Sequence, residues 1–375
     1  MARCRRVRRR DGRRPRPAVG RCPPRLADGG VARAARTLGQ SIYSLRRNQW
    51  SMTDGIVAPF AALYQYWGTL AWTILVVFLA GIVLERYDKE YARSVFVVGW
   101  AVLSVLWVAS IYQFIFDQKS ITEGIGVLVG IPLSLWIGYL LASGRDQLRV
   151  LSRAVGVMWL VYLPASTVDA IRSPLIDTVT GHTAWVLSFF TTEFSLVEGS
   201  AFPSNVNAET AAHTVSFLFQ NPEQGYNVVY TIQLACTGLG SVAIFAGLIA
   251  AVQAPLRRKL KALGAAVAII YVLNIARNVF IAYSFGLQKM HLFPDAIVDL
   301  FALTSTYKVS YILADRIIAQ FLSVVALVGI TYVVVKLLPE VLTIVEEGIY
   351  VFTRKEYDLR QALDVGARTD GGSDE

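Results

Sequence analysis

Three residues of this 375-residue chain could together carry out nucleophilic chemistry. Cys236 is the single cysteine outside residues 1–51, so it cannot form a disulfide within the rest of the chain. Arg277 and Arg316 follow at separations of 41 and 39 residues, each inside an otherwise apolar run. A thiolate is a strong nucleophile that forms more readily near cations or at a helix N-terminus. Arginine keeps its charge at ordinary pH and can hold a carboxylate or stabilise an oxyanion. The combination predicts cysteine catalysis with electrostatic support from arginine.

Each of these residues also has a simpler interpretation. A single cysteine in an apolar helix is more often a small packing residue, and transporters and channels also use arginines inside the membrane. Asp315 could simply neutralise a neighbouring arginine. Asn274, Asn278 and Gln320 lie close to the arginines in sequence, where amides line polar cavities or form hydrogen bonds between helices. An anion transporter or channel and a non-catalytic membrane scaffold therefore stay open as alternatives.

The apolar residues form runs that are long enough to cross a bilayer. Hydrophobic residues make up 54% of the chain and charged residues only 17%, too few charges for a soluble domain of this size. A run of about 20 apolar residues matches the membrane core. We predict seven such spans, at 66–84, 94–116, 121–142, 151–170, 233–252, 262–286 and 309–335. The predicted fold class is all-α, a polytopic membrane bundle of about seven transmembrane helices.

The basic residues of the connecting segments predict an orientation. Four segments are rich in Lys and Arg, namely 85–93, 143–153, 253–261 and 336–360. By contrast, residues 171–232 contain only one basic residue, Arg172. The positive-inside rule places the four basic segments and the C-terminus in the cytoplasm. Cys236, Arg277 and Arg316 then all lie in the outer half of the bilayer, where they could meet.

The first 51 residues differ from the rest in composition. They contain fifteen Arg and two Asp, a net charge of +13; because the whole chain carries +9, the remainder carries 9 − 13 = −4. We expect this leader to be disordered. A basic leader on the outer side would conflict with the positive-inside rule, so we expect translation to begin at Met52. The membrane domain is then 52–340, and 341–375 forms a cytoplasmic tail.

Residues 171–232 are predicted to form an extracellular insertion between the fourth and fifth spans. Short apolar stretches alternate there with polar residues, which fits either strands or short amphipathic helices. The three histidines, His182, His213 and His291, lie in outer segments without clustered carboxylates or cysteines, so we predict no metal site. No phosphate-binding loop or dinucleotide motif is present, so we predict no cofactor. Because the excess of basic residues is confined to the leader, we predict no nucleic-acid partner.

Three segments around the candidate residues resemble one known family. The segments are QLACTGLGSVAIFAGLIAAV, NIARNVFIAYSFG and VSYILADRIIAQ, and they are similar, in this order, to signature segments of the exosortase/archaeosortase family. The resemblance covers most of 52–340. Its last catalytic position is arginine in archaeosortases and commonly histidine in exosortases, so Arg316 favours the archaeal branch. The resemblance implies a membrane-embedded cysteine transpeptidase.

The resemblance also implies a substrate and a division of roles. Archaeosortases process surface proteins, such as an S-layer glycoprotein, whose C-terminal signal is a Pro-Gly-Phe motif, a hydrophobic span and a basic cluster. Cys236 matches the family nucleophile, which forms a thioester with the substrate at the outer face of the plasma membrane. Arg316 would stabilise the oxyanion and Arg277 the thiolate or substrate, although these roles could be exchanged. A membrane lipid would accept the protein. Asp315, a tyrosine such as Tyr311, and water are candidates for the proton donor to the leaving amine.

Overall fold

The structure is a computed structural model of the chain, and it describes residues 55, 57–117, 121–198, 215–220, 227–301, 303 and 306–359. The predicted leader 1–51, residues 360–375 and His213 lie outside these ranges. The described residues from 59 onward form one compact unit. The described residues of this unit fold into helices and a small sheet.

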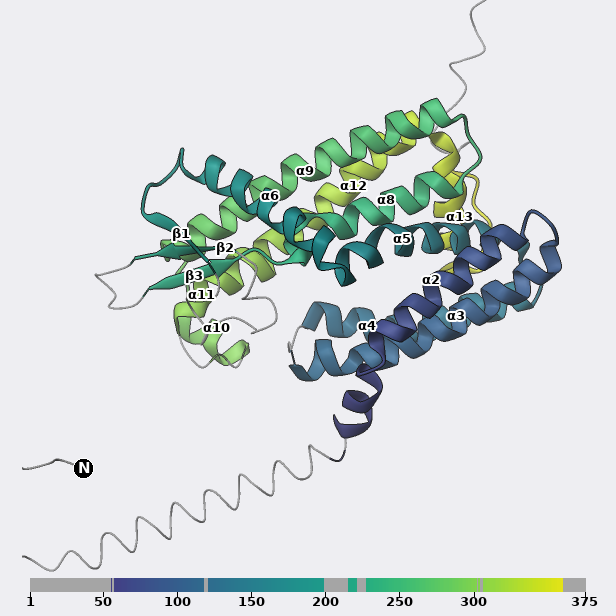
Figure 1. The fold of residues 1–375 in the computed structure, drawn as a ribbon, viewed down its shortest axis with the longest axis horizontal. Helices are drawn as coiled ribbons and strands as arrows, with labels where there is room; N and C mark the ends of the chain where they lie inside the picture. The colour runs from purple at the N-terminus through teal and green to yellow at the C-terminus, as the bar shows by residue number, and fades with distance from the viewer. Residues whose placement is uncertain are drawn as a thin grey trace, which may run out of the picture. The chain divides into compact units, whose positions relative to one another are not determined.

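Long apolar helices make up most of this unit (Figure 1). Within the described ranges, six helical segments have the length and composition to cross a membrane. Their main helices are α2 (Trp67–Leu84), α3 (Lys89–Ile111), α4 (Ile121–Ala142), α5 (Arg149–Thr167), α9 (Leu256–Gly286) and α12 (Gln320–Leu337). π-helical turns extend two of them: Tyr112–Asp117 follows α3, and Ile312–Ala319 connects the short α11 (Val309–Tyr311) to α12. The predicted polytopic helical fold is confirmed.

The fifth predicted span, 233–252, begins too early. A 3₁₀ turn, Leu234–Thr237, precedes α8 (Leu239–Ala251), and this helix has only 13 residues. At 1.5 Å per residue it covers roughly 20 Å, less than the bilayer core. The helix cannot extend backwards through Gly238, because that residue has a φ of +80°. Cys236 therefore lies in a turn before the helix.

Close helix contacts fix the position of α8. It packs against α5 and α9, while α9 also packs against α12. A Cβ atom on Gly247 of α8 would lie 2.3 Å from the carbonyl oxygen of Ala154 on α5. Only glycine allows the two backbones to approach this closely. The turn that precedes α8 is thus attached to a rigid part of the bundle.

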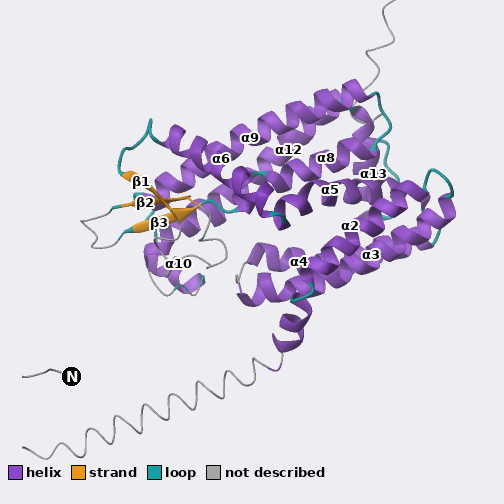
Figure 2. Cartoon of the chain, viewed as in Figure 1, coloured by secondary structure: helices purple, strands orange, loops and turns teal. Residues whose placement is uncertain are grey.

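The predicted insertion contains both a helix and strands. It begins with α6 (Asp169–Leu187) and continues with β1 (Phe194–Glu198), β2 (Val215–Phe219) and β3 (Val228–Thr231). The three strands, orange in Figure 2, form an antiparallel sheet in the order β1-β2-β3. They are an addition to the all-α prediction. Phe217, Phe219 and Tyr230 are buried in one cluster with Ala282 and Phe285 of α9, so apolar burial joins the sheet to the bundle. A short helix, α10 (Pro294–Leu300), follows α9.

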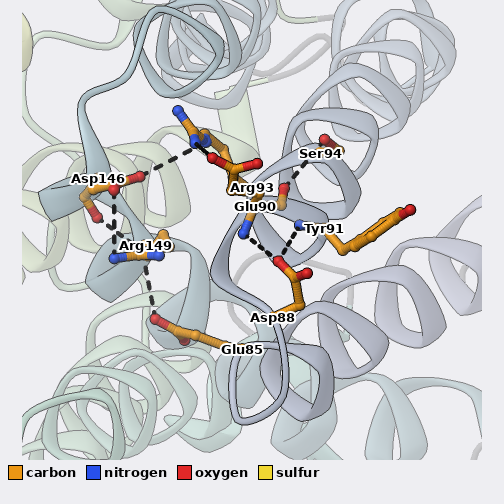
Figure 3. Close-up of polar contacts among 8 residues, drawn as sticks. All are labelled: Glu85, Asp88, Glu90, Tyr91, Arg93, Ser94, Asp146 and Arg149. Carbon is orange, nitrogen blue, oxygen red and sulfur yellow. Dashed lines mark hydrogen bonds and ion pairs between the residues drawn. The ribbon is translucent and has the colours of Figure 1, made fainter.

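Ion pairs connect the helices at the opposite end of the unit from the sheet (Figures 1 and 3). Arg149 of α5 lies 3.5 Å from Glu85 and 3.7 Å from Asp146. Asp146 also lies 3.8 Å from Arg93 of α3. Asp88 caps the N-terminus of α3 by accepting backbone hydrogen bonds. Carboxylates thus neutralise part of the basic charge in the two segments 85–93 and 143–153.

The predicted tail 341–375 begins with a packed helix, α13 (Leu342–Thr353). Its buried Glu347 accepts two hydrogen bonds from Arg145, of 3.1 and 3.3 Å. The Arg145 guanidinium also lies 3.8 Å from the centre of the Tyr350 ring. This part of the tail therefore belongs to the folded unit.

Candidate active site

Cys236 lies in a short turn between the sheet and the bundle. β3 leads into the turn and α8 leads away from it. The Cys236 N–H donates to the carbonyl of Gln233 (2.8 Å), and the Thr237 hydroxyl donates to the carbonyl of Leu234 (2.7 Å). Gly238 closes the turn in the left-handed conformation. Cys236 is partly exposed and Gln233 is exposed, so the turn is accessible to a substrate.

Two asparagines of α9 hold this turn. The side-chain amides of Asn274 and Asn278 each donate a hydrogen bond of 2.8 Å to the carbonyl oxygen of Cys236. They lie four residues apart on one helix face, and both are buried. The side-chain oxygen of Asn278 accepts a hydrogen bond of 3.5 Å from the Tyr230 hydroxyl in β3. The asparagines therefore fix the backbone of the cysteine and link it to the sheet.

Four charged side chains form a connected series beside the turn. Arg277 donates a hydrogen bond of 2.7 Å to Asp315. The other carboxylate oxygen of Asp315 lies 3.7 Å from Nε of Arg316, and Nη1 of Arg316 lies 3.5 Å from Glu123 of α4. Asp315 and Arg316 are consecutive residues of the π-helical segment, a rare conformation that often occurs at functional sites. Two guanidinium groups and two carboxylates give the series a balanced charge.

This arrangement decides how readily the thiol ionises. Cys236 lies outside the six helical segments that could cross the membrane. Although the residue is partly exposed, the protein atoms packed around its sulfur raise the pKa of the thiol. Arg277 opposes this rise more strongly than Arg316 does, and Asp315 adds to it. The sequence predicted that nearby cations would promote the thiolate. The arginines act in that direction, but the net shift of the pKa is upward because burial dominates.

The structure brings together six of the seven predicted site residues: Cys236, Asn274, Arg277, Asn278, Asp315 and Arg316. Gln320 is exposed at the start of α12, and no hydrogen bond between described residues joins it to the others. Two further residues of the site, Glu123 and Tyr230, were not predicted from the sequence. Glu123 lies at the edge of a predicted span, where charged residues are common and do not indicate a functional site. Residues 228–231 are Val, Val, Tyr and Thr, a stretch without alternation of polar and apolar residues, so only the structure shows that Tyr230 faces the core.

Comparison with known proteins assigns the chain to a family. The family model for the transmembrane exosortase (Exosortase_EpsH) matches residues 66–307. Archaeosortase A of Haloferax volcanii is 42% identical over 304 residues, which is 78% of this chain and 96% of that protein. Archaeosortase A of Natronomonas pharaonis is 38% identical over 285 residues, 75% of this chain and 88% of that protein. The chain belongs to the archaeosortase A family.

No solved structure matches this archaeosortase significantly. Its family membership establishes the class of activity: the chain is a membrane cysteine transpeptidase that processes C-terminal Pro-Gly-Phe sorting signals. The transporter and scaffold alternatives are therefore set aside.

Gly238→Ala is expected to destabilise the cysteine turn of the archaeosortase. The left-handed conformation costs a residue with a side chain about 1–2 kcal/mol, and a Cβ atom would lie 3.2 Å from Ile270 and 3.3 Å from Asn274. Thermal unfolding in detergent should occur at a lower temperature, and processing should slow. The control is Gly240→Ala, because a Cβ atom there meets nothing within 4 Å. Equal effects of the two substitutions would contradict the proposal that the turn requires glycine at position 238.

Asn278→Ala is expected to slow processing by roughly ten- to a hundredfold, which corresponds to the loss of a buried hydrogen bond worth about 1–3 kcal/mol. The substitution removes one donor to the Cys236 carbonyl and also the acceptor for Tyr230. Because Asn274 donates to the same oxygen, the double substitution should cost more than the sum of the single ones. Rates of substrate cleavage for the three variants test this coupling, and strictly additive losses would argue against a shared role.

Proposed function

We propose that Cys236 is the nucleophile with which this archaeosortase cleaves its substrates and transfers them to a lipid. The substrates are surface proteins, such as an S-layer glycoprotein, that end in a Pro-Gly-Phe motif, a hydrophobic span and a basic cluster. The enzyme acts in the plasma membrane. Its active site faces the outside, and its C-terminus lies in the cytoplasm.

One observation carries this proposal. Three elements that are distant in sequence meet at the backbone and side chain of a single accessible cysteine. They are the turn after β3, helix α9 and the π-helical segment. The double hydrogen bond from Asn274 and Asn278 fixes the cysteine, and the charges of Arg277, Asp315 and Arg316 all act on its thiol. A packing cysteine needs neither feature, whereas a nucleophile needs both a fixed position and an electrostatic environment.

The chemistry proceeds in two balanced steps. In the first, the Cys236 thiolate attacks the scissile carbonyl carbon, the carbon–nitrogen bond breaks, and the amine takes up a proton and leaves with the hydrophobic span. The product is a thioester between the surface protein and Cys236. In the second step, an amine of a lipid headgroup attacks the thioester and loses a proton. The thiolate leaves, and the protein is attached to the lipid.

The two arginines differ in ways that support separate roles. Arg277 favours the thiolate more strongly than Arg316 does, so it is assigned to the nucleophile. The side chain of Arg316 is 37% exposed, and its contacts to Glu123 and Asp315 are 3.5 and 3.7 Å long. The pair with Glu123 joins two partly exposed side chains, 37% and 43% exposed, and such a pair is weak enough to be exchanged for another anion. Arg316 is therefore assigned to the oxyanion that develops on the scissile carbonyl.

The distribution of charge supports the proposed orientation. The start of α3, the start of α5 and α13 lie at one end of the unit, and the sheet and α10 lie at the other (Figure 1). Arg93 and Arg149 belong to these two helix starts. By the positive-inside rule the basic end is cytoplasmic. The cysteine turn directly follows β3 and therefore belongs to the outer end.

Trapping of the thioester tests the proposed function. The full-length enzyme, reconstituted in lipid vesicles, is mixed with a surface protein that carries the three-part signal, and the reaction is quenched in acid. Mass spectrometry should find the cleaved substrate on Cys236, and hydroxylamine should release it as a hydroxamate. Cleavage with no adduct on Cys236, or with an adduct on another residue, would refute the assignment of the nucleophile.

A further inference from the structure

The proposed reaction, on which this inference rests, needs an acid at the active site. An amine is a poor leaving group unless it receives a proton as the carbon–nitrogen bond breaks. The Cys236 thiolate has already lost its proton, and arginine does not give one up at ordinary pH. Water or a third type of side chain must supply the proton.

Two of the predicted proton donors, Asp315 and Tyr311, already form hydrogen bonds with other groups of the site. Asp315 accepts a hydrogen bond of 2.7 Å from Arg277 and faces Arg316; an ion-paired carboxylate is an acceptor and has no proton to donate. The Tyr311 hydroxyl forms a hydrogen bond with this same carboxylate. Its proton is therefore already shared with Asp315.

Tyr230 differs from both. Its side chain is only 5% exposed, and its hydroxyl makes a long hydrogen bond of 3.5 Å to Asn278, which itself holds the Cys236 carbonyl. Of the ionisable groups that act on this hydroxyl, the thiol of Cys236 acts most strongly. Tyr230 and Cys236 pack in one cluster, and Asn278 links the Tyr230 hydroxyl to the backbone of the nucleophile. The proton that this hydroxyl carries is weakly held by its present acceptor. Burial raises the pKa of Tyr230 well above its ordinary value, so the proton is present at any working pH.

We infer that Tyr230 is the general acid that protonates the departing amine. As the carbon–nitrogen bond breaks, the nitrogen takes the proton of the Tyr230 hydroxyl, and the negative charge of the thiolate ends on the phenolate oxygen. Arg277 is the cation that favours this phenolate. In the second step the incoming amine returns a proton to the phenolate as the thiolate leaves. The outer sheet thereby contributes a catalytic residue.

A change of leaving group tests this role directly. The substrate is prepared semisynthetically with either an amide or a thioester at the scissile position. A thiol with a pKa of about 8.5 leaves as the thiolate and needs no proton. With the amide substrate, Tyr230→Phe should slow cleavage by about 10²- to 10⁴-fold, the usual contribution of a general acid. With the thioester substrate the same variant should cleave at nearly the wild-type rate.

Two controls make the result specific. Phe217→Leu alters the direct cross-strand partner of Tyr230 and should affect both substrates equally, as any disturbance of the sheet would. Cys236→Ala should cleave neither substrate, so failure of the proposed nucleophile is distinguished from failure of the acid. Equal losses with both substrates for Tyr230→Phe would overturn the inference in favour of a positioning role, and wild-type rates with both would overturn it outright.

Discussion

Cys236→Ala is expected to abolish processing of surface proteins while the enzyme still inserts into the membrane. Loss of the attacking atom removes the thioester pathway, and we expect the cleavage rate to fall by at least about 10³-fold. The residue is small and partly exposed, so the free energy of unfolding should change by less than about 1 kcal/mol. The measurement is complementation of a deletion host, with the size and lipid labelling of a surface protein as readouts.

Cys236→Ser serves as the companion variant. It preserves the shape of the side chain and the hydrogen bonds to the backbone carbonyl, which do not involve the sulfur. A serine hydroxyl is a far weaker nucleophile without an adjacent base, so this variant should also be inactive. Unchanged processing by either variant in a host that contains no other archaeosortase would eliminate Cys236 as the nucleophile.

Much of the fold could be predicted because the membrane restricts the alternatives. In a bilayer each long apolar run must form a helix, so α2, α4 and α9 lie close to their predicted positions. The prediction failed where that restriction ends. Hydropathy could not show that Gly238 stops α8 short of the cysteine, because glycine is tolerated within membrane helices. Nor could it choose between strand and helix in the insertion, where both occur.

The site was partly predictable for a similar reason. Charges inside apolar spans are costly, so Arg277 and Asp315 stand out from sequence alone. Which of them pair with one another depends on helix packing, and the bond between Arg277 and Asp315 joins residues 38 positions apart. Glu123 and Tyr230 come from the edge of a span and from the sheet, where polar residues are common. Only their convergence in space identifies them.

The balanced charge of the site has a consequence for mechanism. In the structure both arginines contact Asp315, and Arg316 also contacts Glu123. The thiol is consequently harder to ionise than two nearby cations alone would predict, in agreement with the upward shift of its pKa. In the proposed mechanism, Arg316 exchanges a carboxylate for the substrate carbonyl before it stabilises the oxyanion. Binding of the substrate is thus coupled to this change in the ion pairs of Arg316.

The pH dependence of cleavage is expected to separate the roles of the two arginines. The thiolate is the reactive form, so the rate rises as the pH approaches the pKa of the thiol. Burial raises this pKa and Arg277 is the largest opposing influence. Arg277→Gln should therefore move the rising limb of the pH–rate profile to higher pH. Asp315→Asn, which removes a negative charge, should move this limb to lower pH. Arg277→Lys keeps the positive charge and should shift the limb least.

Arg316→Gln provides the contrast, because Arg316 has a weaker influence on the thiol than Arg277 has. The rising part of the pH–rate profile of this variant should stay near its wild-type position. The plateau rate should fall by about 10²- to 10³-fold, as expected when one donor to an oxyanion is lost. The profiles are measured in reconstituted vesicles at saturating substrate. A large alkaline shift for Arg316→Gln with an unshifted limb for Arg277→Gln would exchange the two assignments, since the residue that controls ionisation of the thiol would then be Arg316.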